Sequence, residues 1–211
     1  MRSKLLIFMS GAICVLPVQT SLAGDLHVDA GVTSDYVWRG LSQTSGGPAV
    51  SGGLEYVTDS DWYMGTWVSN TTRGANGVNS AEVDYYIGTS GKGSSVGYDI
   101  GLINYTYPQS SDLDFSELYF AFMAEGLTFK WSDSADEGTY LEGSITQKLA
   151  FRKNTSVTAH AGTYSRKSGT SYVDTSISLR IEDFSITFSK ADVNTAQDKD
   201  LKTYISWSYS F

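Results

Sequence analysis

Residues 25–39 read DLHVDAGVTSDYVWR, and their side chains alternate in character. The odd-numbered positions carry the charges, with Val37 as a large apolar exception. The even-numbered positions are mostly apolar or aromatic: Leu26, Val28, Ala30, Val32, Tyr36 and Trp38. Successive side chains of a β-strand point to opposite faces, so a period of two indicates a strand with one apolar and one polar face. We therefore predict a strand over 25–39.

The same period recurs along the chain, and no convincing helical period of about 3.6 residues interrupts it. Within most segments the apolar residues occupy positions of one parity, odd-numbered or even-numbered. The charged residues then fall on positions of the opposite parity. With the first segment, these make twelve predicted strands, the others being 48–58, 61–69, 81–90, 95–107, 114–124, 127–132, 139–150, 155–164, 171–181, 184–190 and 200–211.

The predicted connections alternate between long and short. Gly40–Gly47 and Asn70–Ser80 are long, whereas Asp59-Ser60, Gly91–Ser94 and Glu125-Gly126 are tight. Short turns at one end and longer loops at the other are typical of an up-and-down transmembrane β-barrel. An even strand number places both chain ends on the short-turn, periplasmic side. The expected fold class is thus an all-β, antiparallel transmembrane barrel of about 12 strands.

The composition of the two faces favours lipid over water. One face of most strands is nearly free of charge, while the other combines Gly, Ser, Thr and Tyr with moderate charge. In a bilayer every backbone polar group must be paired, so strands span only as a closed ring. The 14 Tyr and 5 Trp fit aromatic girdles, with Trp38, Trp62 and Tyr63 as candidates. A soluble periplasmic sandwich or lipocalin-like barrel is the alternative, but its solvent face would be rich in Lys and Glu.

Both ends of the chain carry export features. Residues 1–23 combine a basic start, an apolar run and small residues before the cleavage point, as a secretory signal peptide does, which leaves a barrel domain over 24–211. The chain ends in ISWSYSF, residues 205–211, with Trp207, Tyr209 and Phe211 at alternate positions. This is typical of the signal that the outer-membrane barrel-assembly machinery reads, although an ordinary amphipathic last strand is the alternative.

Charge and cysteine content exclude several classes of function. Charged residues make up 18% of the chain, against about 25% in ordinary globular proteins. Cleavage removes two basic residues and no acidic one, so the net charge goes from −8 to −10, and it removes the single Cys. The acidic balance argues against nucleic-acid binding, and the mature chain has no thiol nucleophile.

Two segments carry a family resemblance. DYVWRGLSQ at 35–43 and PAVSGGLEY at 48–56 resemble the opening signature of the TorF-like porin family, first catalogued as bacterial proteins of unknown function. Shorter similar pieces follow in order at 65–70, 82–88, 98–101, 105–108 and 160–162. The resemblance covers nearly the whole mature chain and is strongest over 31–108. It implies an outer-membrane barrel with channel activity, and it implies no particular substrate.

A barrel places the polar parity inside, where nine acidic and five basic residues become pore-lining candidates. They are Asp29, Asp35, Arg39, Glu55, Glu82, Asp84, Asp99, Glu117, Lys130, Glu142, Lys148, Asp174, Arg180 and Lys202. Surplus carboxylates in a narrow tube favour cations, because low-dielectric walls focus the field. Alternatively the charges pair and brace the interior, since twelve strands lie between filled barrels of about 8 and open porins of about 16–18.

Arg39 and Asp35 form the sharpest predicted pair, as a charge constriction or as a buried brace beneath the first long loop. The sequence gives little support for catalysis, because only His27 and His160 are present. His27 could act as a general base, but a histidine near a membrane interface is usually not catalytic. Ser156 and Thr158 lie along the strand from His160 and not across from it, so no catalytic triad follows. The acidic turns at 59–61 and 192–194 suit plain turns better than calcium sites. We expect no catalytic residue, metal or cofactor.

The leading hypothesis is an outer-membrane channel for passive diffusion of small hydrophilic solutes or ions, leaning to cations. Its expected partners are outer-membrane lipids, lipopolysaccharide and the barrel-assembly machinery, with no nucleic acid. A closed structural or adhesive barrel is the alternative, followed by an enzyme located at the barrel rim.

Overall fold

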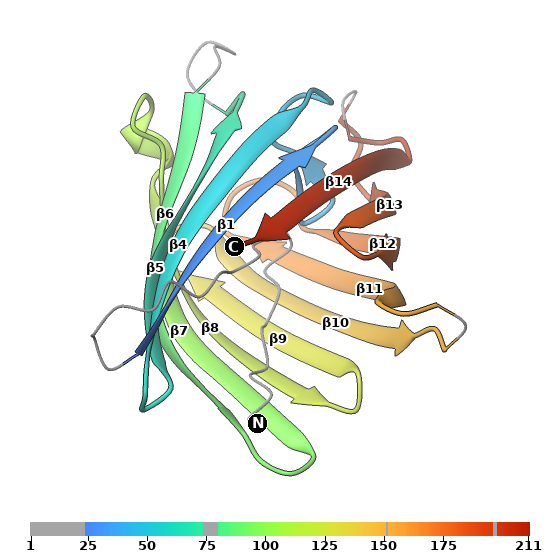
Figure 1. The fold of residues 1–211 in the computed structure, drawn as a ribbon. Coiled ribbons are helices and arrows are strands. Elements are labelled where there is room, and N and C mark those ends of the chain that lie inside the picture. The colour runs from blue at the N-terminus through green and yellow to red at the C-terminus, as the bar shows by residue number, and fades with distance from the viewer. Residues whose placement is uncertain (1–23, 74–79, 151, 196–197) are drawn as a thin grey trace.

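The computed structural model describes residues 24–73, 80–150, 152–195 and 198–211 (Figure 1). Within these residues the chain forms a closed antiparallel barrel of twelve strands, which confirms the predicted fold class and strand number. The predicted signal peptide, residues 1–23, lies outside the described residues. No helix in the described part of the chain is both long and apolar enough to cross a membrane.

Each barrel strand pairs with its neighbours in sequence, and β1 closes the ring against β14 from Asp29↔Ser210 to Thr33↔Ser206. The barrel strands are β1 Gly24–Thr33, β4 Ala49–Thr58, β5 Trp62–Thr71, β6 Ser80–Lys92, β7 Val96–Thr106, β8 Phe115–Ala124, β9 Leu127–Ser134, β10 Gly138–Lys148, β11 Thr155–Arg166, β12 Tyr172–Ile181, β13 Phe184–Ala191 and β14 Lys202–Ser210. A 3-10 turn, η1 Ser111–Leu113, precedes β8.

The two ends of the barrel differ. We call the end with the connections 59–61, 93–95, 125–126 and 182–183 the short-turn end, and the end with 34–48, 107–114 and 167–171 the long-loop end. The first residue of β1 and the last residue of β14 both lie at the short-turn end, as an even strand number requires.

The parity predicted to be apolar lies on the outer surface. Val50 is 65% exposed and Ile177 58%, and every barrel strand except β11 carries at least one large apolar residue that is exposed. The opposite parity points into the barrel, where Glu82 and Glu117 are almost fully buried. The register set by apolar residues alone therefore sorts most strand residues correctly.

The first strand is shorter than the predicted span 25–39. It ends at Thr33, whose hydroxyl donates a hydrogen bond to the carbonyl of Asp35 (2.9 Å) and so supports a turn. The chain then bends into the barrel and forms a small hairpin, β2 Val37–Trp38 and β3 Leu41–Ser42. Arg39 and Gly40 at its tip both have positive φ, 48° and 77°, as a tight two-residue hairpin turn requires.

Two aromatic predictions are wrong for this reason. Tyr36 and Trp38 belong to the inward segment instead of the outer face, and the Trp38 ring packs against Tyr105, Phe115 and Tyr164. Tyr63, a girdle candidate, also points inward and is only 8% exposed, whereas Trp62 beside it is exposed on the outside. Thus Trp62 alone of the three girdle candidates lies on the outer face.

Inward tyrosines lie over glycines of neighbouring strands. A Cβ added to Gly162 would come within 3 Å of the Tyr140 ring, and one added to Gly88 would do the same with Tyr63. Gly65 with Tyr86 and Gly101 with Tyr119 repeat the arrangement. A glycine in a strand often marks such a close approach, and here it lets a large ring lie flat against the wall.

Candidate functional site

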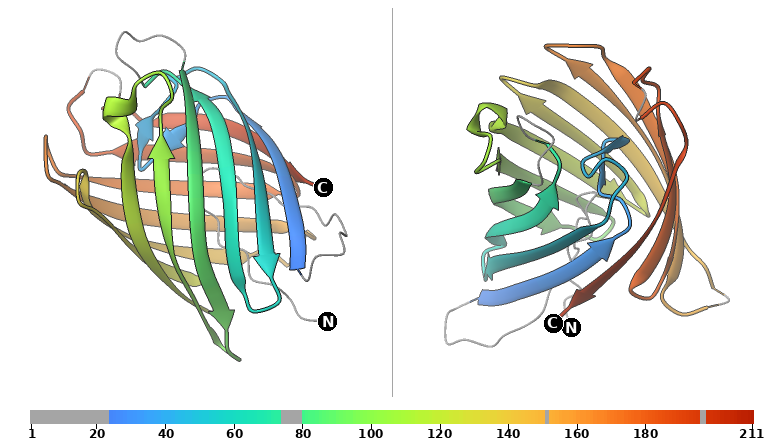
Figure 2. Two further views of the ribbon diagram at one scale, coloured as in Figure 1. Left: turned by 90° about the vertical axis from the view of Figure 1, so that its left-hand side faces the viewer. Right: turned by 90° about the horizontal axis from the view of Figure 1, so that it is seen from above.

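The hairpin lies inside the barrel, and Figure 2 shows it within the ring of strands when the barrel is seen from above. A Cβ on Gly40 would approach the Cβ atoms of Asp174 and Ala191 to within 3 Å, so the tip touches β12 and β13. Trp38 packs against buried aromatic clusters on both sides of the barrel. The hairpin therefore narrows the interior and links its walls.

Arg39 anchors the tip of the hairpin. Its Nη1 and Nη2 donate to the two carboxylate oxygens of Glu117 on β8, both at 2.7 Å. The guanidinium carbon also lies 4.1, 4.3 and 4.9 Å from the ring centroids of Trp38, Tyr140 and Tyr164. Two parallel hydrogen bonds to one carboxylate fix both distance and orientation, and aromatic faces attract the cation further.

Both members of this pair are buried, with side-chain exposures of 5% and 1%. Burial lowers the pKa of Arg39, but the charge of Glu117 and its hydrogen bonds raise it by more, so the pKa lies above its usual value. The guanidinium is therefore charged, and its charge is neutralised by Glu117.

The predicted pairing of Arg39 with Asp35 is wrong. Asp35 instead accepts hydrogen bonds from Ser42 Oγ (2.5 Å) and Thr44 Oγ1 (3.1 Å), both within its own loop. The turn at 34–36 separates the two charges, and Arg39 extends away from Asp35 to the far wall. Asp35 thus shapes the loop that carries Arg39.

Several interior carboxylates accept hydrogen bonds from tyrosines. Glu82 accepts from Tyr36 (2.7 Å) and Tyr107 (2.8 Å), one at each oxygen. Asp99 accepts from Tyr63 (2.5 Å), which is also hydrogen-bonded to the Tyr119 hydroxyl. Asp174 accepts from Tyr140 (2.8 Å), and Glu55 is hydrogen-bonded to Tyr86.

These neutral partners satisfy carboxylates without cancelling their charge. Two further acids, Asp29 and Asp84, each keep one buried carboxylate oxygen with no hydrogen-bond partner among the described residues.

On β9 to β12 the interior charges are mixed. His160 Nε2 lies 3.1 Å from Glu142 Oε2, and its Nδ1 lies 3.6 Å from Asp174 Oδ1. The Lys130 ammonium lies 4.6 Å from the centroid of the Tyr119 ring. Within the described ranges, no group of three or more His, Cys, Asp or Glu residues could hold a metal ion.

The remaining pore-lining candidates lie towards the ends of the barrel. Lys148 is exposed near the short-turn end, where Arg180 Nε donates to the Glu182 carbonyl (2.9 Å). Lys202 pairs with Asp198 at 3.0 Å at the long-loop end. The structure therefore brings Arg39 and Glu117 into one constriction and leaves these three apart from it.

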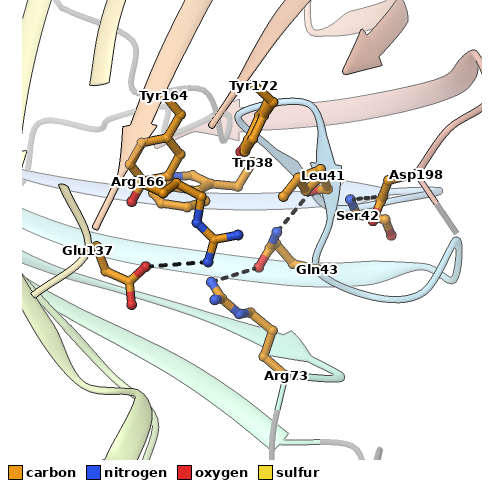
Figure 3. A pocket seen from close by; sticks show the side chains of 10 residues that line it. All are labelled: Trp38, Leu41, Ser42, Gln43, Arg73, Glu137, Tyr164, Arg166, Tyr172 and Asp198. Carbon is orange, nitrogen blue, oxygen red and sulfur yellow. Dashed lines mark hydrogen bonds and ion pairs between the residues drawn. The ribbon is translucent and has the colours of Figure 1, made fainter. Parts of the chain in front are cut away.

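A pocket of ≈ 140 Å³ that the sequence does not predict lies beside the hairpin at the long-loop end (Figure 3). Among the residues that line it are Trp38, Gln43, Arg73, Arg166 and Tyr172. The signal available in the sequence was weak: an arginine close after β5 and another at the end of β11. Only the inward fold of residues 34–48 brings these arginines and Trp38 to one space.

The residues of the predicted assembly signal lie on the outer surface at the seam between β14 and β1. The rings of Trp207 and Tyr209 stack with centroids 6.0 Å apart, and Phe211 meets Tyr209 edge-on at 5.1 Å. The Phe211 amide donates to the carbonyl of Val28 on β1 (3.3 Å). The last residues thus form one aromatic strip along β14, beside the closing seam.

Together these features define a class of protein: a single-chain, twelve-stranded antiparallel barrel with an apolar outside, a charged inside and a hairpin folded into its interior. Residues 20–210 match the family described as "Bacterial protein of unknown function (Gcw_chp)", and the chain belongs to this family. No curated protein matches the chain in sequence.

Proposed function

We propose that this protein is a narrow outer-membrane channel through which small hydrophilic solutes or ions diffuse passively. The observation that carries the proposal is the distribution of side chains on a closed barrel, with large apolar residues exposed outside and charged residues buried inside. Soluble proteins rarely expose apolar patches larger than a few hundred Å², whereas a lipid bilayer covers such a belt.

Strand length and sequence resemblance support the same assignment. Strands β1, β7 and β14 contain 10, 11 and 9 residues, and about 9–11 tilted residues span a bilayer. The segments 35–43 and 48–56 resemble the TorF-like porins, for which a channel is the implied activity. The outer aromatic strip ending at Phe211 fits recognition by the barrel-assembly machinery.

A preference for cations follows from the interior acids. Glu117 is neutralised by Arg39, but Glu82 and Asp99 accept hydrogen bonds from neutral tyrosines. Asp29 and Asp84 are buried on the same half of the wall. Uncompensated carboxylates in a narrow, low-dielectric tube attract cations and repel anions.

The hairpin also favours a second candidate, a closed structural or adhesive barrel. The contacts of Gly40 with β12 and β13 and the paired Arg39 fill the middle of the interior. In that case the barrel would be stable in the membrane and pass no current.

Planar-bilayer recording tests the channel against the closed barrel. We expect the refolded protein to give small, reproducible conductance steps, and a salt gradient to give a reversal potential of cationic sign. Folding is checked first by the faster gel mobility of the unboiled protein. Folded protein that repeatedly gives no steps would overturn the channel, and a reversal potential of anionic sign would overturn the cation preference.

A further inference from the structure

The pocket at the long-loop end is large enough for one small organic molecule. Its volume of ≈ 140 Å³ is close to the about 150 Å³ that admits benzene in an engineered protein cavity. Trp38 and Leu41 of the hairpin supply apolar lining, and polar groups of several other segments complete the wall (Figure 3). A ring-sized body therefore fits beside the hairpin.

Two arginines, Arg73 and Arg166, line this pocket and offset the charges of its two carboxylates, and Figure 3 shows both guanidinium groups turned into it. Arg166 is only loosely paired, with Nη2 at 3.8 Å from Glu137 Oε2, and its buried Nε has no hydrogen-bond partner among the described residues. Arg73 donates to the neutral amide oxygen of Gln43 at 3.3 Å. Neither arginine is held as Arg39 is, by two hydrogen bonds of 2.7 Å to one carboxylate.

Asp198, one of the two carboxylates of the pocket, already has partners within the protein. Asp198 pairs with Lys202 at 3.0 Å and accepts a hydrogen bond from the Ser42 amide, also at 3.0 Å. Glu137 is thus left as the partner that Arg166 faces, and the pocket keeps an excess of hydrogen-bond donors over acceptors.

Two tyrosines of the pocket depart from the pattern of the interior. Tyr36, Tyr63 and Tyr140 each donate a hydrogen bond to a carboxylate. Tyr164 and Tyr172 are as deeply buried, at 2% and 4% exposed, yet neither hydroxyl has a partner among the described residues. A buried hydroxyl without a partner is unfavourable, so such a group calls for an acceptor.

We propose that this pocket binds a small carboxylate with a compact apolar body. The carboxylate accepts hydrogen bonds from Arg73, Arg166 and the tyrosine hydroxyls, and the apolar body lies against Trp38 and Leu41. The ligand thereby supplies the acceptor that the two tyrosines lack. The inference rests on the proposed function in one respect, since it names a class of solute that enters the barrel at the long-loop end.

Binding is measured on the full refolded chain in detergent by isothermal titration calorimetry at low salt. The probes are benzoate, benzyl alcohol and benzylamine, which share a ring and differ in charge. We expect saturable binding of benzoate, with both other probes weaker by about tenfold or more, because hydrogen bonds to a charged group are the stronger ones. Equal affinity for benzoate and benzyl alcohol would overturn the proposal.

Two variants locate the site. Arg166→Gln should weaken benzoate binding by about tenfold or more, and Tyr172→Phe by about threefold to tenfold. Because the Tyr172 hydroxyl has no partner in the described protein, its removal should leave folding intact even where Arg166→Gln disturbs it. Arg152→Gln, exposed in the connection between β10 and β11 at the short-turn end, is the matched control and should bind like the parent protein.

Unchanged benzoate affinity in folded Tyr172→Phe and Arg166→Gln proteins would place binding elsewhere and overturn the proposal. Conductance separates this result from the proposed function. Benzoate binding by a protein that passes no current would reject the channel and keep the site. Conductance steps without benzoate binding would reject the site and keep the channel.

Discussion

At the scale of single residues, Arg39 and Glu117 show how a charged pair is tolerated inside the barrel. Each is almost fully buried, and each satisfies the other with two hydrogen bonds of 2.7 Å. Removing one member leaves the other charge buried without compensation, which costs more than the intact pair contributes. The consequences of the two kinds of substitution, single and double, therefore differ.

We expect Arg39→Leu to lower the free energy of unfolding by about 3–5 kcal/mol. The double variant Arg39→Leu with Glu117→Leu should recover much of that loss, because no unpaired charge remains. Urea unfolding in lipid vesicles, followed by tryptophan fluorescence, measures these two variants and the single variant Glu117→Leu. A double variant as unstable as the sum of the two single variants would show that the pair itself is not coupled.

The contact between Gly162 and Tyr140 provides a second test at this scale. A methyl group on Gly162 would meet the ring of Tyr140, which is buried and held by its hydrogen bond to Asp174. Gly162→Ala should therefore destabilise the barrel by about 1–3 kcal/mol through overpacking. Gly143→Ala is the matched control, since its new Cβ would find its nearest neighbour at 3.9 Å, the carbonyl oxygen of Thr128. Equal unfolding midpoints for the two variants would contradict the close-packing role.

At the scale of elements, side-chain parity predicts the barrel strands well and the first loop badly. From β4 onwards a turn follows each apolar alternation, so the pattern stops where the strand stops. After Thr33 the alternation continues through Tyr36 and Trp38 although the backbone has already turned. The sequence alone does not distinguish the two cases. An alternation of apolar residues looks the same whether these residues pack inside the barrel, as those of the hairpin do, or face lipid.

The same limit explains which parts of the candidate site were predictable. Parity places Glu82, Asp99 and Glu117 on the inner face, because each lies within a regular strand. It cannot supply the partner of Arg39, since that contact depends on the path of a loop through space. The pocket at the long-loop end depends on the same path and was missed for the same reason.

The final strand carries a prediction of its own. Phe211→Ser should lower the amount of folded barrel in the outer membrane, because it removes the last ring of the aromatic strip that runs along β14 beside the seam. Leu201→Ser is the control, since Leu201 is also exposed, at 60%, but lies directly before the other end of the strand. The measurement is the heat-modifiable band in membrane fractions. Normal levels of the Phe211→Ser protein would argue against a terminal assembly signal.

At the scale of the whole molecule, the barrel wall and the hairpin that narrows its interior are built from separate segments of the chain. Thr33 and Ala49 are register partners on β1 and β4, so the strands already meet where residues 34–48 leave and return. A two-residue turn such as Asn-Gly suits two antiparallel strands at this separation. Replacing 34–48 by Asn-Gly thus removes the hairpin without changing the pairing of the wall.

We expect this replacement to raise single-channel conductance severalfold and to strengthen cation preference, because Trp38 and Arg39 leave the interior while Glu117 loses its counter-charge. Shortening the exposed connection at 168–170, which lies outside the hairpin, is the control and should leave conductance near that of the parent protein. The folded state of each variant is checked by gel mobility before recording. If the hairpin-free barrel conducts like the parent, the bore is set by the wall side chains. If its conductance rises but it turns anion-selective, the interior acids do not govern selectivity.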